Sequence, residues 1–266
     1  MNDAALELVE AAAYTALWQA APESSRREGV EARIVAGALC TTVATAPGNT
    51  MINRVTGLGL HGAPSEAVLD EIDAFFRAAG TQYAIAVSPF ATPGLREQLT
   101  ARGFEEGYGW MKFRRGVVPA PQIETELRVE EIGPEGAEAF GSVVARGYGM
   151  PESAAAWLGA ATAAPGFRAF LSFDGEEPAG AAGLFVGDGI GWLGLAATLP
   201  EHRRKGAQGA LLAARIRAAA DAGVPELATE TGERLPDRPS NSYRNLLRAG
   251  FEEQYVRPNY LSPASS

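Results

Sequence analysis

The chain has 266 residues, of which 46% are hydrophobic and 21% are charged, and its formal net charge is −9. This length and composition suit an ordinary folded protein with one large domain or two small ones. The acidic balance argues against a nucleic-acid-binding protein, which usually presents a broad basic face.

Few cysteines and histidines limit the chemistry further. Cys40 is the only cysteine, so we expect no disulfide within the chain and no thiolate metal cluster. His61 and His202 lie far apart and form no helical ligand pair, so we expect no metal ion. No apolar run approaches the roughly 20 residues that span a bilayer. The acidic N-terminal segment does not resemble a secretory signal. We therefore expect a cytoplasmic protein without membrane partners, and the sequence leaves its oligomeric state open.

The first half predicts alternating helices and strands. Ser65-Glu66 is a capped, acidic helix start, and the helical pattern that follows ends at Gly80. A short strand is predicted at 83–87. A further helical pattern precedes Gly103, and the aromatic-rich segment 108–113 follows it. Prolines and valines at 117–125 then break both patterns, which predicts a linker there.

The second half predicts a mixed sheet with helices on both faces. Strands are predicted at 127–131, 167–174, 179–187, 190–197 and 226–231, with a final strand near the end of the chain. Helices are predicted at about 134–146, 206–222 and 240–249, and 151–163 is a helical or loop segment.

The two halves show the same pattern in the same order. Gly103-Phe104-Glu105-Glu106 recurs as Gly250-Phe251-Glu252-Glu253, and Leu58-Gly59-Leu60 recurs as Leu193-Gly194-Leu195. Helical patterns ending at Gly80 and Gly223 also match, as do the strands that follow them. The second copy has eight more residues between its strand and its helix.

Those extra residues contain a basic, glycine-containing loop. Arg203-Arg204-Lys205-Gly206 follows an apolar strand and precedes an alanine-rich helix. A helix start offers unpaired N–H donors and the positive end of the macrodipole, so this arrangement binds anions. A solvated surface turn without a ligand could have the same sequence. Three cations are, however, electrostatically misplaced at a helix start unless an anion binds there.

The pattern Arg203-x-x-Gly206-x-Gln208 resembles the Arg/Gln-x-x-Gly-x-Gly/Ala signature of the GNAT N-acetyltransferase superfamily, which holds the pyrophosphate of acetyl-CoA. The resemblance implies a mixed α/β (α+β) fold of two tandem GNAT-like domains, each a mixed, mostly antiparallel twisted sheet flanked by helices. It makes 1–116 a degenerate copy without a pyrophosphate loop, 117–125 a linker and 126–266 the acetyltransferase domain.

The implied reaction is transfer of an acetyl group from acetyl-CoA to a primary amine of a small-molecule or peptide acceptor, by direct attack in a ternary complex. The residues implied to bind acetyl-CoA are Leu195, Ala196, Ala197, Arg203, Arg204, Lys205, Gly206, Ala207, Gln208, Gly209, Ala210, Asn241 and Tyr243. Gln208 departs from the glycine or alanine of the signature, and Asn241 could instead cap a helix. The strand at 190–197 could equally be an ordinary buried strand.

Acid–base catalysis has several candidates. Glu230, near the end of the strand after the basic helix, is our candidate base, whereas Glu201 and His202 would more simply hold the loop. In the family a tyrosine protonates the leaving thiolate, but the matching position here is Leu246. Tyr243, one turn earlier, is our candidate in its place, with packing as the alternative.

The acceptor side is expected at the connection between the first two helices of the second half, because such loops carry specificity. Tyr148 and Met150 lie on it and are predicted to bind the acceptor. Trp157, Trp192 and Phe167 are interpreted as core.

Two other function classes remain at this stage. A coenzyme A- or acyl-CoA-binding module or sensor without turnover would keep the basic loop and tolerate Leu246. A nucleotide-binding P-loop would need an early glycine and a Gly-Lys-Ser/Thr ending, both of which are missing here.

Overall fold

The computed structural model describes residues 4–237 and 240–263, and its strands form one eleven-stranded sheet in the order β1-β2-β3-β4-β11-β5-β10-β9-β8-β7-β6. The strands are β1 (Val30–Val35), β2 (Ala38–Val43), β3 (Arg54–Thr56), β4 (Ala84–Ala86), β5 (Glu105–Gly116), β6 (Arg128–Ile132), β7 (Phe167–Asp174), β8 (Glu177–Gly187), β9 (Ile190–Thr198), β10 (Glu226–Gly232) and β11 (Glu252–Leu261). The α-helices are α1 (Ala5–Gln19), α2 (Glu23–Arg27), α3 (Glu66–Ala79), α4 (Leu95–Ala101), α5 (Ala137–Gly147), α6 (Ala154–Gly159), α7 (Ala207–Asp221) and α8 (Asn241–Arg248).

Helix α3 shows how local sequence sets an element. The Ser65 hydroxyl accepts a hydrogen bond from the Val68 N–H, and the helix ends at Gly80 in the left-handed conformation with φ +67°. Leu69, Ile72 and Phe76 recur at helical spacing and are buried. Capping and periodicity therefore define both ends of the helix and its buried face.

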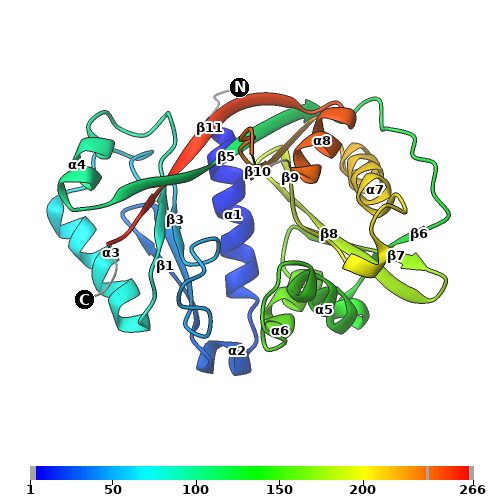
Figure 1. The fold of residues 1–266 in the computed structure, drawn as a ribbon, viewed down its shortest axis with the longest axis horizontal. Helices are drawn as coiled ribbons and strands as arrows, with labels where there is room; N and C mark the ends of the chain where they lie inside the picture. The colour runs from blue at the N-terminus through cyan, green and yellow to red at the C-terminus, as the bar shows by residue number, and fades with distance from the viewer. Residues whose placement is uncertain (1–3, 238–239, 264–266) are drawn as a thin grey trace.

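The sheet of the second half is covered on both faces. Ala169 and Leu171 of β7 pack with α5, α6 and α1, whereas Phe170 packs with α7 and α8. Successive residues of a strand point to opposite faces. Helices α5, α6 and α1 therefore lie on one side of the sheet, and α7 and α8 lie on the other (Figure 1).

The two halves exchange their long strands. Strand β5 of the first half lies between β10 and β11 of the second half, and β11 lies between β4 and β5. Residues 226–232 of β10 and 252–261 of β11 both pair antiparallel with β5. The exchanged strands β5 and β11 pass over the upper part of the molecule in Figure 1, above helix α1, which lies between the two lobes.

The fold class predicted from sequence is confirmed as a mixed α/β fold with a large, mostly antiparallel sheet. In the described part of the chain only two neighbouring pairs of strands are parallel, β3 with β4 and β9 with β10. These pairs occupy corresponding places in the two halves, as the repeated sequence pattern requires. The sheets of the halves are fused into one through the exchanged strands. The division into 1–116, 117–125 and 126–266 stays a prediction.

Helix α1 was not anticipated as a structural element. It packs against β8, β9 and β10 of the second half as well as against β1 and β2. Its buried residues include Leu6, Val9 and Ala13, which line one face. None of the described helices is long and apolar enough to cross a membrane.

The strand exchange predicts that neither half folds alone. Residues 1–121 expressed without 122–266 lack the strand between β4 and β5, and the complementary fragment lacks the strand between β10 and β11. We expect each fragment to be aggregated or unfolded when produced alone, because each exposes unpaired strand edges. Co-expressed with an affinity tag on one fragment, the two should purify together. Cooperative thermal unfolding of either isolated fragment would contradict this.

Candidate active site

Strands β9 and β10 separate at the centre of the second half. Their parallel pairing covers only 190–192 and 226–228; beyond this, β9 continues along β8 and β10 along β5. The Thr229 hydroxyl donates a 2.7 Å hydrogen bond to the Leu193 carbonyl oxygen where the separation begins. Beyond that point, residues 194–196 of β9 line a cavity, and the Ala196 backbone forms a hydrogen bond with the Tyr148 hydroxyl.

A β-bulge in β9 lies at the same place. The register of β8 with β9 shifts between Ala181 and Gly183, and Leu195 has a φ of +51°. A left-handed conformation is costly for a residue with a branched side chain. It redirects the backbone N–H groups of 195–197, which the sequence predicts to contact acetyl-CoA.

The basic loop leads from β9 into α7. A short 3₁₀ helix, Pro200–His202, is followed by Arg203 to Gly206, and Gly206 is the N-cap residue of α7, with a φ of +89°. Arg203, Arg204 and Lys205 are all exposed. No acidic residue lies in the first turn of α7 and no side chain caps it. The first N–H groups of a helix have no partner within it. This helix start therefore fits an anion such as a pyrophosphate.

Side chains around the loop hold it in place. The His202 ring Nδ1 lies 2.9 Å from an Asp174 carboxylate oxygen, which also accepts a hydrogen bond from Lys205. Glu201 is exposed and forms a 2.8 Å ion pair with Arg146. These contacts favour the loop-holding alternative for Glu201 and His202. Thr125, just before β6, donates to the Lys205 carbonyl oxygen at 2.6 Å.

A cavity of about 200 Å³ lies at the separation of β9 and β10. From the face that carries α7 and α8, it is lined by Gln208, Leu212, Arg215, Ser242 and Leu246. From the opposite face and the first half, it is lined by Tyr14, Leu17, Trp18, Met51, Ile52, Tyr148, Met150, Trp157 and Leu158. The cavity therefore reaches both faces of the sheet through the gap between the two strands.

Glu230 on β10 is the one carboxylate among the residues that line this cavity. Lys112 donates to it at 2.9 Å, and the Trp192 indole N–H lies 3.1 Å and 3.2 Å from its two oxygens. Burial raises the pKa of Glu230, nearby Glu10 raises it further, and Lys112 offsets part of the rise. A carboxyl group with a raised pKa in a cavity suits a general base.

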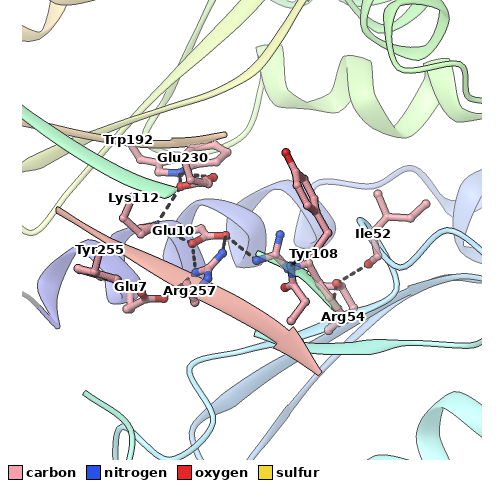
Figure 2. Close-up of polar contacts among 12 residues, drawn as sticks. Glu7, Glu10, Ile52, Arg54, Tyr108, Lys112, Trp192, Glu230, Tyr255 and Arg257 are labelled. Atoms are coloured by element: carbon pink, nitrogen blue, oxygen red, sulfur yellow. Dashed lines mark hydrogen bonds and ion pairs between the residues drawn. The ribbon is translucent and has the colours of Figure 1, made fainter. Parts of the chain in front are cut away.

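Glu230 forms one end of a buried cluster of charges, which we call the charge cluster: Glu7, Glu10, Arg54, Lys112, Glu230 and Arg257. Figure 2 shows Glu10 of α1 between Arg257, Lys112 and Arg54. The distances from Glu10 are 2.8 Å to Lys112, 2.9 Å to Arg54 and 3.0 Å to Arg257. Burial alone would raise the pKa of Glu10, but Arg257 and Lys112 hold it well below its usual range. The cluster joins α1, β3, β5, β10 and β11.

Arg215 of α7 is a second buried cation at the cavity. Its Nε donates to the Leu211 carbonyl oxygen at 3.1 Å, and its Nη1 donates to that of Gly183 at 3.1 Å. No ion pair joins it to a carboxylate in the described part of the chain. Burial lowers its pKa to about 9, which is still above neutral pH. Arg215 therefore remains charged and places a positive charge behind the bulge of β9.

The predicted site residues fall into two groups. Leu195, Ala196, Gln208, Glu230, Tyr148 and Met150 line the cavity together. Tyr243 does not: its hydroxyl donates to Glu253, and its ring packs on Phe113 with centroids 4.9 Å apart. Its predicted role as proton donor thus gains no support from this geometry. Leu246 does line the cavity.

Asn241 lies in the first turn of α8, and its side chain accepts a hydrogen bond from Arg244. Ser240 caps the helix instead, since its hydroxyl accepts from the Tyr243 N–H at 3.2 Å. Ala197 lies behind the cavity wall against the end of α5, where a Cβ on Gly147 would come within 2.5 Å of its Cβ.

Sequence reasoning missed the contribution of the first half to the cavity and to the charge cluster. Tyr14, Trp18, Glu7 and Glu10 all lie on α1, which was not considered as an element. The available signal was the spacing of Leu6, Val9, Ala13 and Leu17 along one helical face, with Glu10 among them. A carboxylate placed on an apolar helical face indicates a buried partner.

Replacing Glu10 with Gln is expected to destabilise the protein by about 3–5 kcal/mol, because it leaves three buried cations with too little negative charge. Urea unfolding followed by circular dichroism measures this. Glu66→Gln is the matched control, because Glu66 pairs with Arg102 on the surface and its loss should hardly change the free energy of unfolding. Equal effects of the two substitutions would contradict a structural role for the charge cluster.

Comparisons with known proteins agree on the fold. No protein-family model matches the sequence, and no curated protein matches it. A GCN5-related N-acetyltransferase from Kribbella flavida superposes with a TM-score of 0.63 at 19% identity, covering 96% of each chain.

Two further structures share the arrangement. A tandem GNAT protein from the clavulanic acid biosynthesis pathway has a TM-score of 0.60 at 14% identity, over 86% of this chain and 79% of that one. A GCN5-related N-acetyltransferase from Sphaerobacter thermophilus also has a TM-score of 0.60 at 14% identity, over 80% of this chain and 73% of that one. The chain therefore has the fold of the GNAT N-acetyltransferases, in its tandem form.

Proposed function

We propose that the protein is an N-acetyltransferase that transfers an acetyl group from acetyl-CoA to a primary amine within a ternary complex. The observation that carries this proposal is the cavity at the separation of β9 and β10, which joins an anion-binding helix start on one side to a buried carboxylate on the other. The acceptor would be a small molecule or a peptide, and we keep the expectation of a cytoplasmic location.

The start of α7 would hold the pyrophosphate. Backbone N–H groups from Arg204 to Gly209 and the positive end of the helix supply the attraction, and the exposed basic side chains add to it. The backbone of β9 at 195–197 would then bind the pantetheine arm in a strand-like manner. Gln208 and Leu246 line the cavity between these two regions.

Acetyl-CoA would supply an acetyl thioester whose carbonyl carbon bonds to the amine nitrogen while its bond to sulfur breaks. The N–H groups at the bulge of β9 would donate to the carbonyl oxygen as negative charge develops on it. Arg215, behind the bulge, adds positive potential at the same place. Glu230 would take the proton from the amine, with Lys112 and Trp192 fixing the orientation of its carboxylate.

The alternative is a coenzyme A- or acyl-CoA-binding module without turnover. Leu246 at the family's tyrosine position would be compatible with it. A carboxylate with a raised pKa at the wall of the cavity suits a general base, and this favours the enzyme over the binding module.

Gly206→Trp is expected to weaken acetyl-CoA binding by about tenfold or more, because a side chain would fill the start of α7. A Cβ there already meets the Thr125 Cβ at 3.0 Å. Gly223→Trp is the matched control: it lies at the other end of α7, also has a positive φ, and a Cβ there meets nothing within 4 Å. Isothermal titration calorimetry measures both. Equal affinity of the two variants would place the cofactor elsewhere.

Glu230→Gln is expected to lower kcat by about 10²–10⁴-fold with little change in acetyl-CoA affinity, because it removes the general base. The base works in its deprotonated form, and the pKa of Glu230 is raised. In the wild-type protein kcat should therefore rise with pH through a midpoint above the ordinary glutamate value. The variant should lose this limb of the profile.

Glu201→Gln serves as the control for the competing candidate base, because Glu201 is exposed and paired with Arg146. We expect it to keep both kcat and the pH profile. Steady-state kinetics across pH, with release of the coenzyme A thiol as the readout, tests both variants. If Glu201→Gln, and not Glu230→Gln, abolished the rise of kcat with pH, Glu201 would be the general base.

A further inference from the structure

The acceptor end of the cavity is built from aromatic rings of both halves. Tyr14 and Trp18 come from α1, Trp110 from β5, Trp157 from α6 and Trp192 from β9. Ring centroids are 5.2 Å apart for Tyr14 and Trp192, and 4.6 Å apart for Trp18 and Trp157. These rings pack edge-on or tilted against each other, and together they form an apolar wall that suits a flat apolar group or a single cation.

Trp192 lies along its own strand toward this end. A Cβ on Gly194 would come within 1.8 Å of the Trp192 ring. The ring can therefore occupy this space only because residue 194 has no side chain. The same indole donates to Glu230. The Glu230 carboxylate therefore lies at the N–H edge of the indole, within the aromatic end of the cavity, where it would bind the amine of the acceptor.

One polar atom in this wall has no partner. The Trp157 indole Nε1 is buried and makes no hydrogen bond, although the side chain lines the cavity and is 2% exposed. An unsatisfied buried N–H is costly unless a ligand or water accepts from it. The acceptor molecule would supply that oxygen or nitrogen.

The charge and size of the cavity restrict the acceptor further. Its lining residues include one carboxylate, Glu230, and one cation, Arg215. In a molecule with several ammonium groups, only one of them would have a carboxylate partner in this cavity. A cavity of about 150 Å³ holds a benzene molecule, so about 200 Å³, part of which the acetyl end of the cofactor would occupy, leaves room for no more than one ring with a short side chain.

We propose that the acceptor is a monoamine that carries one aromatic ring with a hydrogen-bond-accepting substituent, the amine directed to Glu230 and the substituent to Trp157. This inference rests on the proposed acetyltransferase function and names its substrate class. It also gives the first half a definite role, because α1, β5 and the segment at Met51 and Ile52 form much of the wall around the ring.

The test compares four amines with the full-length protein: 2-phenylethylamine, 2-(4-methoxyphenyl)ethylamine, n-butylamine and spermidine. We expect kcat/KM for the two aromatic amines to exceed those of n-butylamine and spermidine by at least about tenfold. The methoxy compound should be preferred to the unsubstituted one. Equal or better use of spermidine or n-butylamine would overturn the aromatic assignment while leaving acetyl transfer intact.

Two variants locate the ring. Trp157→Phe keeps a ring but removes the N–H, so kcat/KM for the methoxy compound should fall about three- to tenfold more than kcat/KM for 2-phenylethylamine. Ile52→Trp should fill the cavity and lower kcat/KM for both aromatic amines, whereas Ile34→Trp, on an exposed residue of β1, should not. An unchanged methoxy preference in Trp157→Phe would overturn the placement of the substituent, even if Ile52→Trp fails to fold.

Calorimetry separates the two levels of the proposal. Acetyl-CoA is titrated first, and 2-phenylethylamine is then titrated with coenzyme A present. Absence of acetyl-CoA binding would overturn the proposed function itself. Binding of acetyl-CoA without binding or acetylation of either aromatic amine would overturn only the substrate class.

Discussion

Burial of charge at the junction of the two halves is the constraint on which the rest of the structure depends. The charge cluster holds three carboxylates and three cations, and Glu10, Lys112 and Arg257 have no exposed side-chain surface. Each such ion would cost several kcal/mol if it lost its partner. Helix α1 and strands β3, β5, β10 and β11 must therefore assemble in one register. The cluster that joins the halves also supports Glu230, so the stability of the molecule and the protonation of its candidate base depend on the same contacts.

The two halves share a fold but differ at the helix that follows the first strand of each parallel pair. Helix α3 starts with the Ser65 cap, which accepts from the Val68 N–H, and with Glu66 in its first turn, whose charge complements the helix dipole. Helix α7 has neither. The first half would have no place for a pyrophosphate at this helix. In the proposed function the second half would hold the anion, and the first half would complete the acceptor side with α1 and its aromatic side chains.

Local patterns predicted most of the second half. Strand β7 runs from Phe167 to Asp174, as predicted, and α7 differs from its prediction by one residue at each end. Such elements depend on periodicity and caps that lie within the segment. The strand exchange could not be predicted, because pairing of β5 with β10 joins residues more than a hundred positions apart. Lys112 and Arg257 are charged residues in strands, which a sequence pattern assigns to solvent. Tyr243 was chosen by position on a helix, but its hydroxyl turns to Glu253 because the ring fills the core beside Phe113.

The exchange of β5 and β11 has a consequence for synthesis of the chain. Strand β11 leaves the ribosome after every other described strand, yet it belongs between β4 and β5. Until it arrives, the first half has an unfilled slot in its sheet, and the charges of Glu7 and Glu10 lack Arg257. The two halves therefore cannot fold one after the other during synthesis. The edges of β4 and β5 stay unpaired until β11 has been made. Non-local closure of this kind slows folding and prolongs the exposure of strand edges.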